Sequence, residues 1–360
     1  MTALAFAEVG AGLVLVGITL YDLFQSVVVP RPAVGKLRLS GPIVRLLWKA
    51  WRAVGLRDPE PASREAFLGS FAPVALICLL ALWVASLILG YGLVLHGLRH
   101  ELQPPPGDFG TAVYFSGVSL LTLGYGDIVP GSGPARVVAL VEAANGFGIV
   151  ALVVSLLFSL YGSFQRREVL VVILDAMAGA PPSAVQLLEK CREQEMRPYL
   201  ISTFDDWRQW CAEVLESHLA YPILNYFRSS HDNESWLSSL GAVMDAATLV
   251  ITTVEGVPRG PARLLNRVGN HLVEDLAQIM GFPLNHDVGI ERFEFDQVRE
   301  RLRDAGFTLA PADQAWEDFG RLRSSYAAPL NAMAVYWAIP PAPWVGDRSY
   351  MPHRERVAAS

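Results

Sequence analysis

Three long apolar stretches dominate the first half of this sequence and constrain what the chain can fold into. They cover residues 4–29, 68–98 and 135–164. A helix rises about 1.5 Å per residue, so each stretch is long enough to cross a hydrocarbon layer of roughly 30 Å. Only 18% of the 360 residues are charged, against about 25% in an average soluble protein. The pattern predicts an all-α membrane protein with three spans.

The charges between these stretches set their orientation. Residues 30–67 include eight basic and three acidic side chains, and the third stretch leads directly into Arg166 and Arg167. Loops rich in lysine and arginine stay on the cytosolic side. We therefore expect a multi-pass protein of the plasma membrane with its N-terminus outside and residues 166–360 in the cytosol. The first stretch is expected to be a retained span, because it lacks a basic leading segment and is too long for a signal peptide.

The basic loop contains a second pattern, in which tryptophan and aliphatic residues alternate with Arg45, Lys49 and Arg52. This spacing is typical of an amphipathic helix on the cytosolic membrane surface. A voltage-sensing helix would need regularly spaced arginines inside an apolar span. The basic residues here are irregularly spaced and follow Gly41 and Pro42. We therefore expect an interfacial helix.

A shorter apolar segment, residues 109–121, lies between the second and third spans. It is too short to cross a bilayer, so we expect a re-entrant helix whose following residues line a cavity. Glycine adopts backbone conformations that other residues resist, and the string after this helix has two glycines that are two positions apart. That string is Thr122, Leu123, Gly124, Tyr125, Gly126 and Asp127.

This string, with the short helix before it and a span on each side, resembles the signature T-[VIL]-G-Y-G-D of the pore-loop potassium channels. The resemblance covers about residues 68–165 and leaves out the first span and the C-terminal half. It implies a homotetramer with a pore in which backbone carbonyl groups replace the water around a potassium ion. It implies that K⁺ is held at Thr122, Leu123, Gly124 and Tyr125, with Gly126 completing the selectivity filter.

The same resemblance implies supporting roles around the filter. Thr122 would add a hydroxyl group at the inner end, Tyr125 would pack behind the filter, and Asp127 would anchor its outer end. Related non-selective channels replace the aromatic residue at the position of Tyr125, so its presence favours potassium. Many family members have threonine at the position of Leu121, a difference that concerns conductance and inactivation more than ion choice.

The third span is expected to line the cavity. Gly146 and Gly148 are candidate hinge residues, because glycine weakens a helix interior by about 1 kcal/mol relative to alanine. Close helix packing is the alternative for these glycines. An apolar stripe is a candidate gate, unless it packs against the second span. That stripe consists of Phe147, Val150, Val154 and Phe158.

Two of the acidic residues within the spans, Asp22 and Glu142, are singled out here, because an ionisable side chain at membrane depth is a functional candidate. Glu142 is expected to support the filter from behind, hydrogen-bonded to Ser116 or Ser119, with a protonated carboxyl group as one option. A cation site in the cavity is the alternative for Glu142. Asp22 is expected to extend from the first span toward the basic loop.

Beyond residue 165 the apolar residues recur with helical spacing in six segments, separated by breaks with glycine, proline or polar residues. The expected helices cover residues 183–194, 204–227, 234–254, 261–280, 291–305 and 313–337. Residues 169–175 resemble a buried strand, as in nucleotide-binding regulatory domains. That fold needs a G-x-G-x-x-G loop, and only Gly179 is present. We therefore expect residues 165–178 to continue the third span as helix.

The role of this second half is open between two interpretations, a sensor for an unknown cytosolic ligand or partner and an assembly domain. An enzyme is disfavoured, because no nucleophile–base pair or paired carboxylates stand out. Three cysteines without a C-x-x-C pair predict neither disulfides nor a metal site. We expect no cofactor and no nucleic-acid partner. A non-conducting receptor and a weakly selective cation channel are the alternatives to a potassium channel.

The expected division of the chain follows from these patterns. It consists of an extra span over residues 1–30, a basic interfacial segment over 31–67, a pore domain over 68–165, a helical cytosolic domain over 166–340 and a flexible tail over 341–360.

Overall fold

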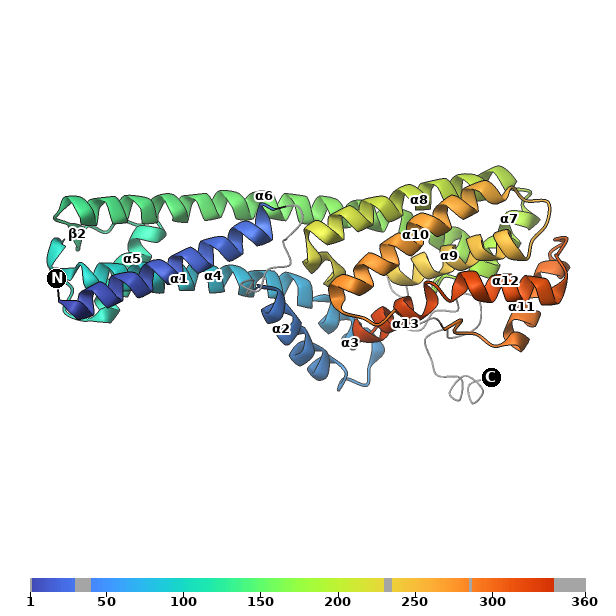
Figure 1. Ribbon diagram of the computed structural model, residues 1–360, viewed down its shortest axis with the longest axis horizontal. Coiled ribbons are helices and arrows are strands. Elements are labelled where there is room, and N and C mark those ends of the chain that lie inside the picture. Colours follow the sequence, from blue (N-terminus) through green and yellow to red (C-terminus); the bar gives the residue numbers. More distant parts are fainter. Residues whose placement is uncertain (1, 30–39, 230–234, 285–286, 340–360) are drawn as a thin grey trace. The chain divides into compact units, whose positions relative to one another are not determined.

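The computed structural model describes residues 2–29, 40–229, 235–284 and 287–339 (Figure 1). The chain divides into a first unit that ends at Tyr161 and a second unit that begins at Gly162, where the sequence suggested a boundary at residue 165. The expected tail and the first part of the basic segment lie outside the described residues. The helices of the first unit are α1 (Ala3–Val27), α2 (Ser40–Gly55), α3 (Pro61–Gly69), α4 (Phe71–Gly97), α5 (Phe109–Leu120) and the start of α6 (Gly133–Ala178).

Three described segments are long and apolar enough to cross a membrane, which confirms the predicted spans. They are α1, the pair α3–α4 over Pro61–Gly97, and α6. The helix α6 is longer than the apolar stretch that predicted it and continues to Ala178. Residues 165–178 are therefore helical, as the missing glycine loop led us to expect. Among the described residues the only strands are β1 (Leu102–Gln103) and β2 (Val129–Pro130), so these residues form no nucleotide-binding sheet.

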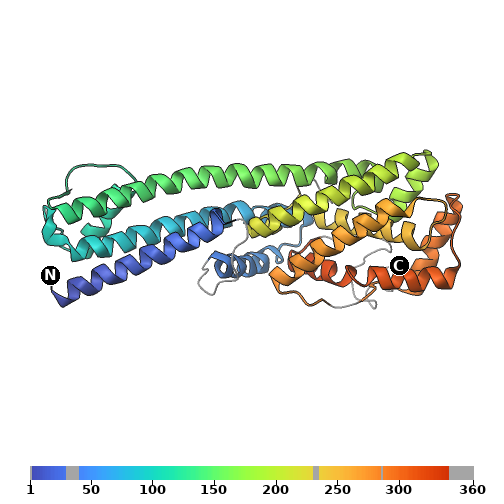
Figure 2. The same ribbon diagram turned by 45° about the horizontal axis from the view of Figure 1, so that its top comes forward.

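Small residues allow α1 and α4 to pack closely side by side (Figures 1 and 2). A Cβ atom placed on Gly12 would come within 2.5 Å of the Gly90 carbonyl oxygen, and one on Gly97 within 2.8 Å of the Ala5 carbonyl oxygen. Helices in a membrane associate mainly through such close packing, because lipid supplies little hydrophobic driving force between them. The helix α1 is therefore held against α4 along much of its length.

Asp22 does extend toward the basic loop, as expected, but its side chain is buried and only 1% exposed. One carboxylate oxygen accepts a hydrogen bond of 2.8 Å from the Trp83 indole of α4. The other accepts one of 3.2 Å from the backbone N–H of Ser40, the first residue of α2. A buried charge is tolerated when it is hydrogen-bonded, so Asp22 connects three helices instead of reaching water.

The helix predicted in the basic loop is present as α2, but its tryptophans face the protein. Trp48 is buried and packs edge-on against Phe71 at a ring separation of 4.9 Å. Trp51 stacks on Phe67 at 4.7 Å and donates a hydrogen bond to its carbonyl oxygen. On the opposite side, Leu46 is exposed. The aromatic residues therefore attach α2 to the start of the second span, and contact of α2 with the membrane surface stays a prediction.

The second unit is a bundle of helices around α9 (Trp236–Thr252), in which every residue except Ile251 is buried. Its neighbours α8 and α10 run side by side in both views (Figures 1 and 2). A side chain at Gly269 of α10 would overlap the sulfur of Met244 in α9, so these two helices are in close contact. The other helices of the second unit are α7 (Ala184–Glu193), α8 (Arg197–Ala220), α10 (Arg259–Met280), α11 (Arg292–Asp304), α12 (Ala312–Arg323), α13 (Ala327–Tyr336) and the 3₁₀ turn η2 (Pro222–Tyr226).

Two of the predicted helices in this unit have different limits. The segment expected over residues 313–337 is broken between α12 and α13. A proline ring clashes with the carbonyl group four residues earlier in a helix, so Pro329 prevents a continuous helix through Ser325 and instead lies in the first turn of α13. The segment expected over residues 204–227 begins earlier, at Arg197, where Pro198 is tolerated because it lies in the first turn. It also ends earlier, at Ala220, and the 3₁₀ turn η2 follows.

Candidate functional site

The predicted filter string lies directly after α5. Asp108 caps the start of this helix by accepting a hydrogen bond of 2.7 Å from the Thr111 N–H. At the other end, the N–H groups of Thr122 and Leu123 bond to carbonyl groups in the last turn of the helix, at 3.0 and 2.9 Å. The string therefore starts from a fixed position at the C-terminal end of α5.

The backbone of the string alternates in handedness. Thr122, Gly124 and Gly126 have φ values of +55°, +61° and +79°. In an ordinary strand, successive peptide groups point to opposite sides, and changing the sign of φ at every second residue allows their carbonyl groups to point to the same side. Gly124 and Gly126 adopt this conformation without strain, whereas at the β-branched Thr122 it costs about 1–3 kcal/mol. The sequence indicated the two glycines but not the conformation of Thr122.

The outer end of the string is held by several contacts. The Tyr114 hydroxyl group on α5 hydrogen-bonds to the carboxylate of Asp127. Beyond it, β2 pairs with β1, and the Gly131 N–H donates a 2.8 Å hydrogen bond to the Glu101 carbonyl oxygen. Residues 121–127 are nevertheless exposed in a single chain. Both ends of the filter segment are thus fixed by their own chain, while its middle is open for other groups to cover.

Glu142 on α6 lies behind α5, fully buried within one chain. Its Oε1 atom lies 2.5 Å from the Ser116 hydroxyl oxygen, and that hydroxyl group is also 2.9 Å from the Ile88 carbonyl oxygen of α4. Of the two serines proposed as partners, the structure brings Ser116 to Glu142 and not Ser119. Because a second chain cannot reach a side chain with no exposed surface, these contacts belong to the single subunit.

The inner helix meets α5 at Gly146. The Leu120 carbonyl group of α5 occupies the space that a Cβ atom on Gly146 would need. The neighbouring Asn145 donates a hydrogen bond of 2.5 Å to the Tyr91 hydroxyl group of α4. These contacts give Gly146 the packing role that the sequence left as an alternative. Nothing lies within 4 Å of the corresponding position on Gly148, and a hinge at either glycine stays a prediction.

The apolar stripe of α6 does not pack against the second span. Its four members are all exposed, from 48% to 77% of each side chain's surface. The alternative that this stripe packs on α4 is therefore wrong for the single chain, and the face is open. The exposed residues are Phe147, Val150, Val154 and Phe158.

The last part of α6 enters the second unit through Arg167, which the sequence used only as a sign of the cytosolic side. Its side chain is buried and donates hydrogen bonds of 2.8 and 3.1 Å to the carbonyl oxygens of Phe227 and Leu224. It also lies 3.2 Å from the His218 ring and over the ring of Trp236. Arg167 therefore fixes the end of α6 within the second unit, a role that no sequence pattern indicated.

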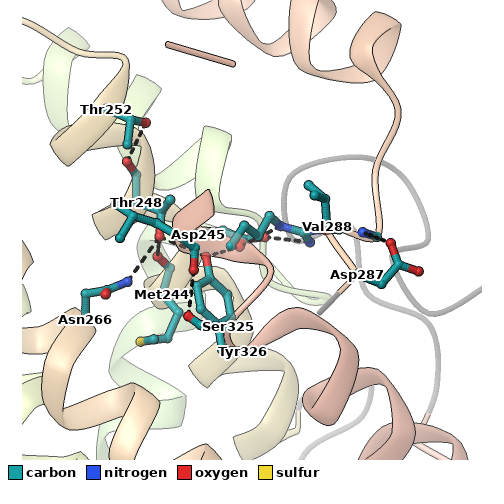
Figure 3. Close-up of polar contacts among 12 residues, drawn as sticks. Met244, Asp245, Thr248, Thr252, Asn266, Asp287, Val288, Ser325 and Tyr326 are labelled. Atoms are coloured by element: carbon teal, nitrogen blue, oxygen red, sulfur yellow. Dashed lines mark hydrogen bonds and ion pairs between the residues drawn. The ribbon is translucent and has the colours of Figure 1, made fainter. Parts of the chain in front are cut away.

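A second buried charge connects α9 to the end of α12, and Figure 3 labels Asp245, Thr248 and Tyr326 of the same network. Arg323 donates to both carboxylate oxygens of Asp245, at 2.9 and 3.1 Å. The Tyr326 hydroxyl group donates to Asp245 at 2.6 Å and lies 2.9 Å from the Thr248 hydroxyl group. All four side chains are fully buried. This network is internal to the second unit and leaves no surface for a ligand.

A spanning helix, a short re-entrant helix, an exposed string with fixed ends and a second spanning helix define a pore-loop ion-channel domain. Comparison with known proteins agrees, because residues 76–162 match the Ion_trans_2 family model, described as an ion channel. The first span and the second unit lie outside that match.

A longer similarity is to the "Uncharacterized membrane protein YdjJ" of Bacillus subtilis. The two are 24% identical over 215 residues, which is 58% of this chain and 61% of the relative. The match thus takes in less than two thirds of the relative's own length. No solved structure matches the chain.

Proposed function

We propose that this chain is one subunit of a homotetrameric potassium channel that conducts K⁺ passively, with no enzymatic activity. The observation that carries the proposal is the filter string, in which every second residue has a positive φ and both ends are fixed. Backbone carbonyl groups that face one axis can replace the hydration shell of a potassium ion. Tyr125 favours K⁺ over a mixed cation pore, by resemblance to selective channels.

The geometry of one chain supports the proposed homotetramer. A single filter string supplies only one side of a coordination shell, so four copies are needed for a closed ring. Residues 121–127 and the apolar stripe from Phe147 to Phe158 are both exposed, as surfaces around a shared axis would be. Each α5 would then direct its C-terminal end, with about half a negative charge, toward the cavity. The stripe would form an apolar gate.

The orientation rests on charge. The basic residues between the first two spans favour a cytosolic location for α2 and for the second unit, with the N-terminus outside and the protein in the plasma membrane. Arg167 contributes less to this argument than the sequence suggested, because its charge is buried inside the second unit.

The decisive experiment is potassium flux from liposomes that contain the purified full-length protein. We expect K⁺ to pass and Na⁺ to be excluded. Gly124→Asp should abolish flux, because a side chain strains this backbone and adds a charge to the filter. Gly256→Asp is the matched control, since Gly256 also has a positive φ and open surroundings but lies in the second unit. Equal passage of Na⁺ would support a weakly selective cation channel, and absence of any flux would support a non-conducting receptor.

The second unit is either a sensor or an assembly domain, and deletion of residues 182–360 separates the two. The contacts that Arg167 of α6 makes within the second unit support the sensor, because a change in this unit would reach the inner helix directly. A sensor predicts intact tetramers with altered opening. An assembly domain predicts that the tetramer dissociates, which light scattering of the detergent-solubilised protein would detect.

A further inference from the structure

The Ser116 hydroxyl group contacts two oxygen atoms but carries only one hydrogen. The Ser116 oxygen lies 2.9 Å from the Ile88 carbonyl oxygen and 2.5 Å from Oε1 of Glu142. Both distances lie within the range of O–H···O hydrogen bonds. A serine hydroxyl group carries one hydrogen, and a backbone carbonyl group carries none. Two full hydrogen bonds therefore need a second hydrogen, and among these three groups only the carboxyl group of Glu142 can supply it.

The surroundings of Glu142 support the same conclusion. The side chain has no exposed surface, and the described residues offer no ion-pair partner for it. Its second oxygen, Oε2, has no hydrogen-bond partner in the described part of the chain. The polar group in contact with it is Ser116 from α5. Tyr91 from α4 is near enough to interact with it electrostatically, and the amide of Asn145 on its own helix is bonded to Tyr91. A carboxylate would leave a charge without compensation at membrane depth.

We propose that Glu142 is a neutral carboxylic acid that donates its hydrogen to Ser116, while Ser116 donates to Ile88. This chain of two hydrogen bonds connects α6, α5 and α4 in sequence behind the filter. Glu142 is then a positioning residue, because the hydrogen bond from its carboxylic acid to Ser116 holds the pore helix α5 in place. If the proton is lost to water at alkaline pH, Ser116 must turn its only hydrogen toward the carboxylate, and the link to Ile88 is broken.

The protonation state can be tested without any measurement of conduction. In infrared difference spectra of the full-length protein in liposomes, wild type minus Glu142→Gln should show the band of a protonated carboxylic acid at neutral pH. Wild type minus Glu300→Gln is the control, because Glu300 is exposed on α11 and should show only carboxylate bands. A carboxylate band in the Glu142 difference spectrum would overturn the proposal, whether or not the protein conducts potassium.

The positioning role rests on the proposed function, and its test is the dependence of flux on pH. Wild-type flux should fall reversibly, by about tenfold, as the external pH is made alkaline, since one hydrogen bond is lost from the support. Glu142→Gln should conduct with a flat profile, because an amide N–H can still donate to Ser116. Ser116→Thr, which keeps the hydroxyl group, should resemble wild type, and Ser116→Ala should conduct about tenfold less.

Two outcomes would contradict this role. One is an alkaline loss of flux that persists unchanged in Glu142→Gln, which would assign the titration to another group. The other is a Ser116→Ala variant with wild-type flux and wild-type pH dependence. If wild type conducts no potassium at any pH, the proposed function fails, while the infrared result on the proton of Glu142 stands independently.

Discussion

The carbonyl oxygen of Leu120 fills the space that a side chain on Gly146 would need. The pore helix therefore ends directly against the backbone of the inner helix. Because Gly146 has no side chain, the last turn of α5 can approach α6 this closely. The start of the filter string follows directly from that turn.

Gly146→Ala should consequently force α5 and α6 apart. We expect a loss of stability of about 1–3 kcal/mol, as for other overpacked sites, and a strong reduction in flux, with thermal unfolding in detergent and liposome flux as the measurements. Gly148→Ala distinguishes packing from flexibility, because its surroundings are open. If both alanine variants lose activity equally without loss of stability, a hinge and not packing explains these glycines.

The ion pair between Asp245 and Arg323 should be costly to break from one side. Removing one partner of a buried pair leaves an uncompensated charge and costs about 3–5 kcal/mol. We therefore expect Asp245→Leu or Arg323→Met to lower the thermal unfolding midpoint of the second unit sharply. Tryptophan fluorescence of the full-length protein would measure this midpoint. The double variant Asp245→Leu/Arg323→Met should recover much of this loss, and a strictly additive effect would contradict the pairing.

The second unit should lose stability in acid because of His218. Burial, and then the charge of Arg167, hold the pKa of this imidazole well below its usual value. In the unfolded chain histidine takes up a proton below about pH 6.5, so the unfolded state binds more protons there. Stability should be unaffected above that pH and should decrease by up to about 1.4 kcal/mol per pH unit below it.

Thermal midpoints measured between neutral and mildly acidic pH test this expectation. His218→Gln should reduce the acid sensitivity. His271→Gln is the control, because His271 is a largely exposed residue of α10. Equal acid sensitivity in wild type and both variants would show that other groups dominate.

The two cysteines of the second unit should be protected from thiol reagents in the folded protein. Burial raises the pKa of Cys191 to about 11 and that of Cys211 still further. Only the thiolate reacts readily, so both should remain unmodified near pH 8 and react once denaturant is added. Mass spectrometry of the labelled protein would assign the sites, and rapid modification of Cys211 in the native state would show that its helix α8 is not packed as described.

The helices of the membrane part could be predicted from the sequence, because each is recognised from a short, continuous segment. A span is recognised by its length and a re-entrant helix by its shortness. Residues 122–127 were recognised by their resemblance to a family signature, and their role as a filter stays a prediction. The packing role of Gly146 was only one of two options, because a glycine within a helix can serve flexibility or contact, and only the position of Leu120 decides between them.

The contacts that the sequence did not predict join residues far apart in the chain. Asp22 could be interpreted as snorkelling, since no neighbouring residue in the sequence indicates that its partner is Trp83, 61 positions later. The pairing of Asp245 with Arg323 spans 78 positions. The break before α13 is different, because it could have been predicted from Pro329. The prediction of one helix over residues 313–337 did not take this proline into account.

The complete enclosure of α9 has a mechanical consequence. A helix with neighbours on every side cannot slide or tilt without separating several interfaces at the same time, and interiors this densely packed deform little. Amide protons of α9 should thus be among the last to exchange with deuterated solvent. We accordingly expect that a force on any outer helix of this bundle displaces the whole bundle as one rigid body.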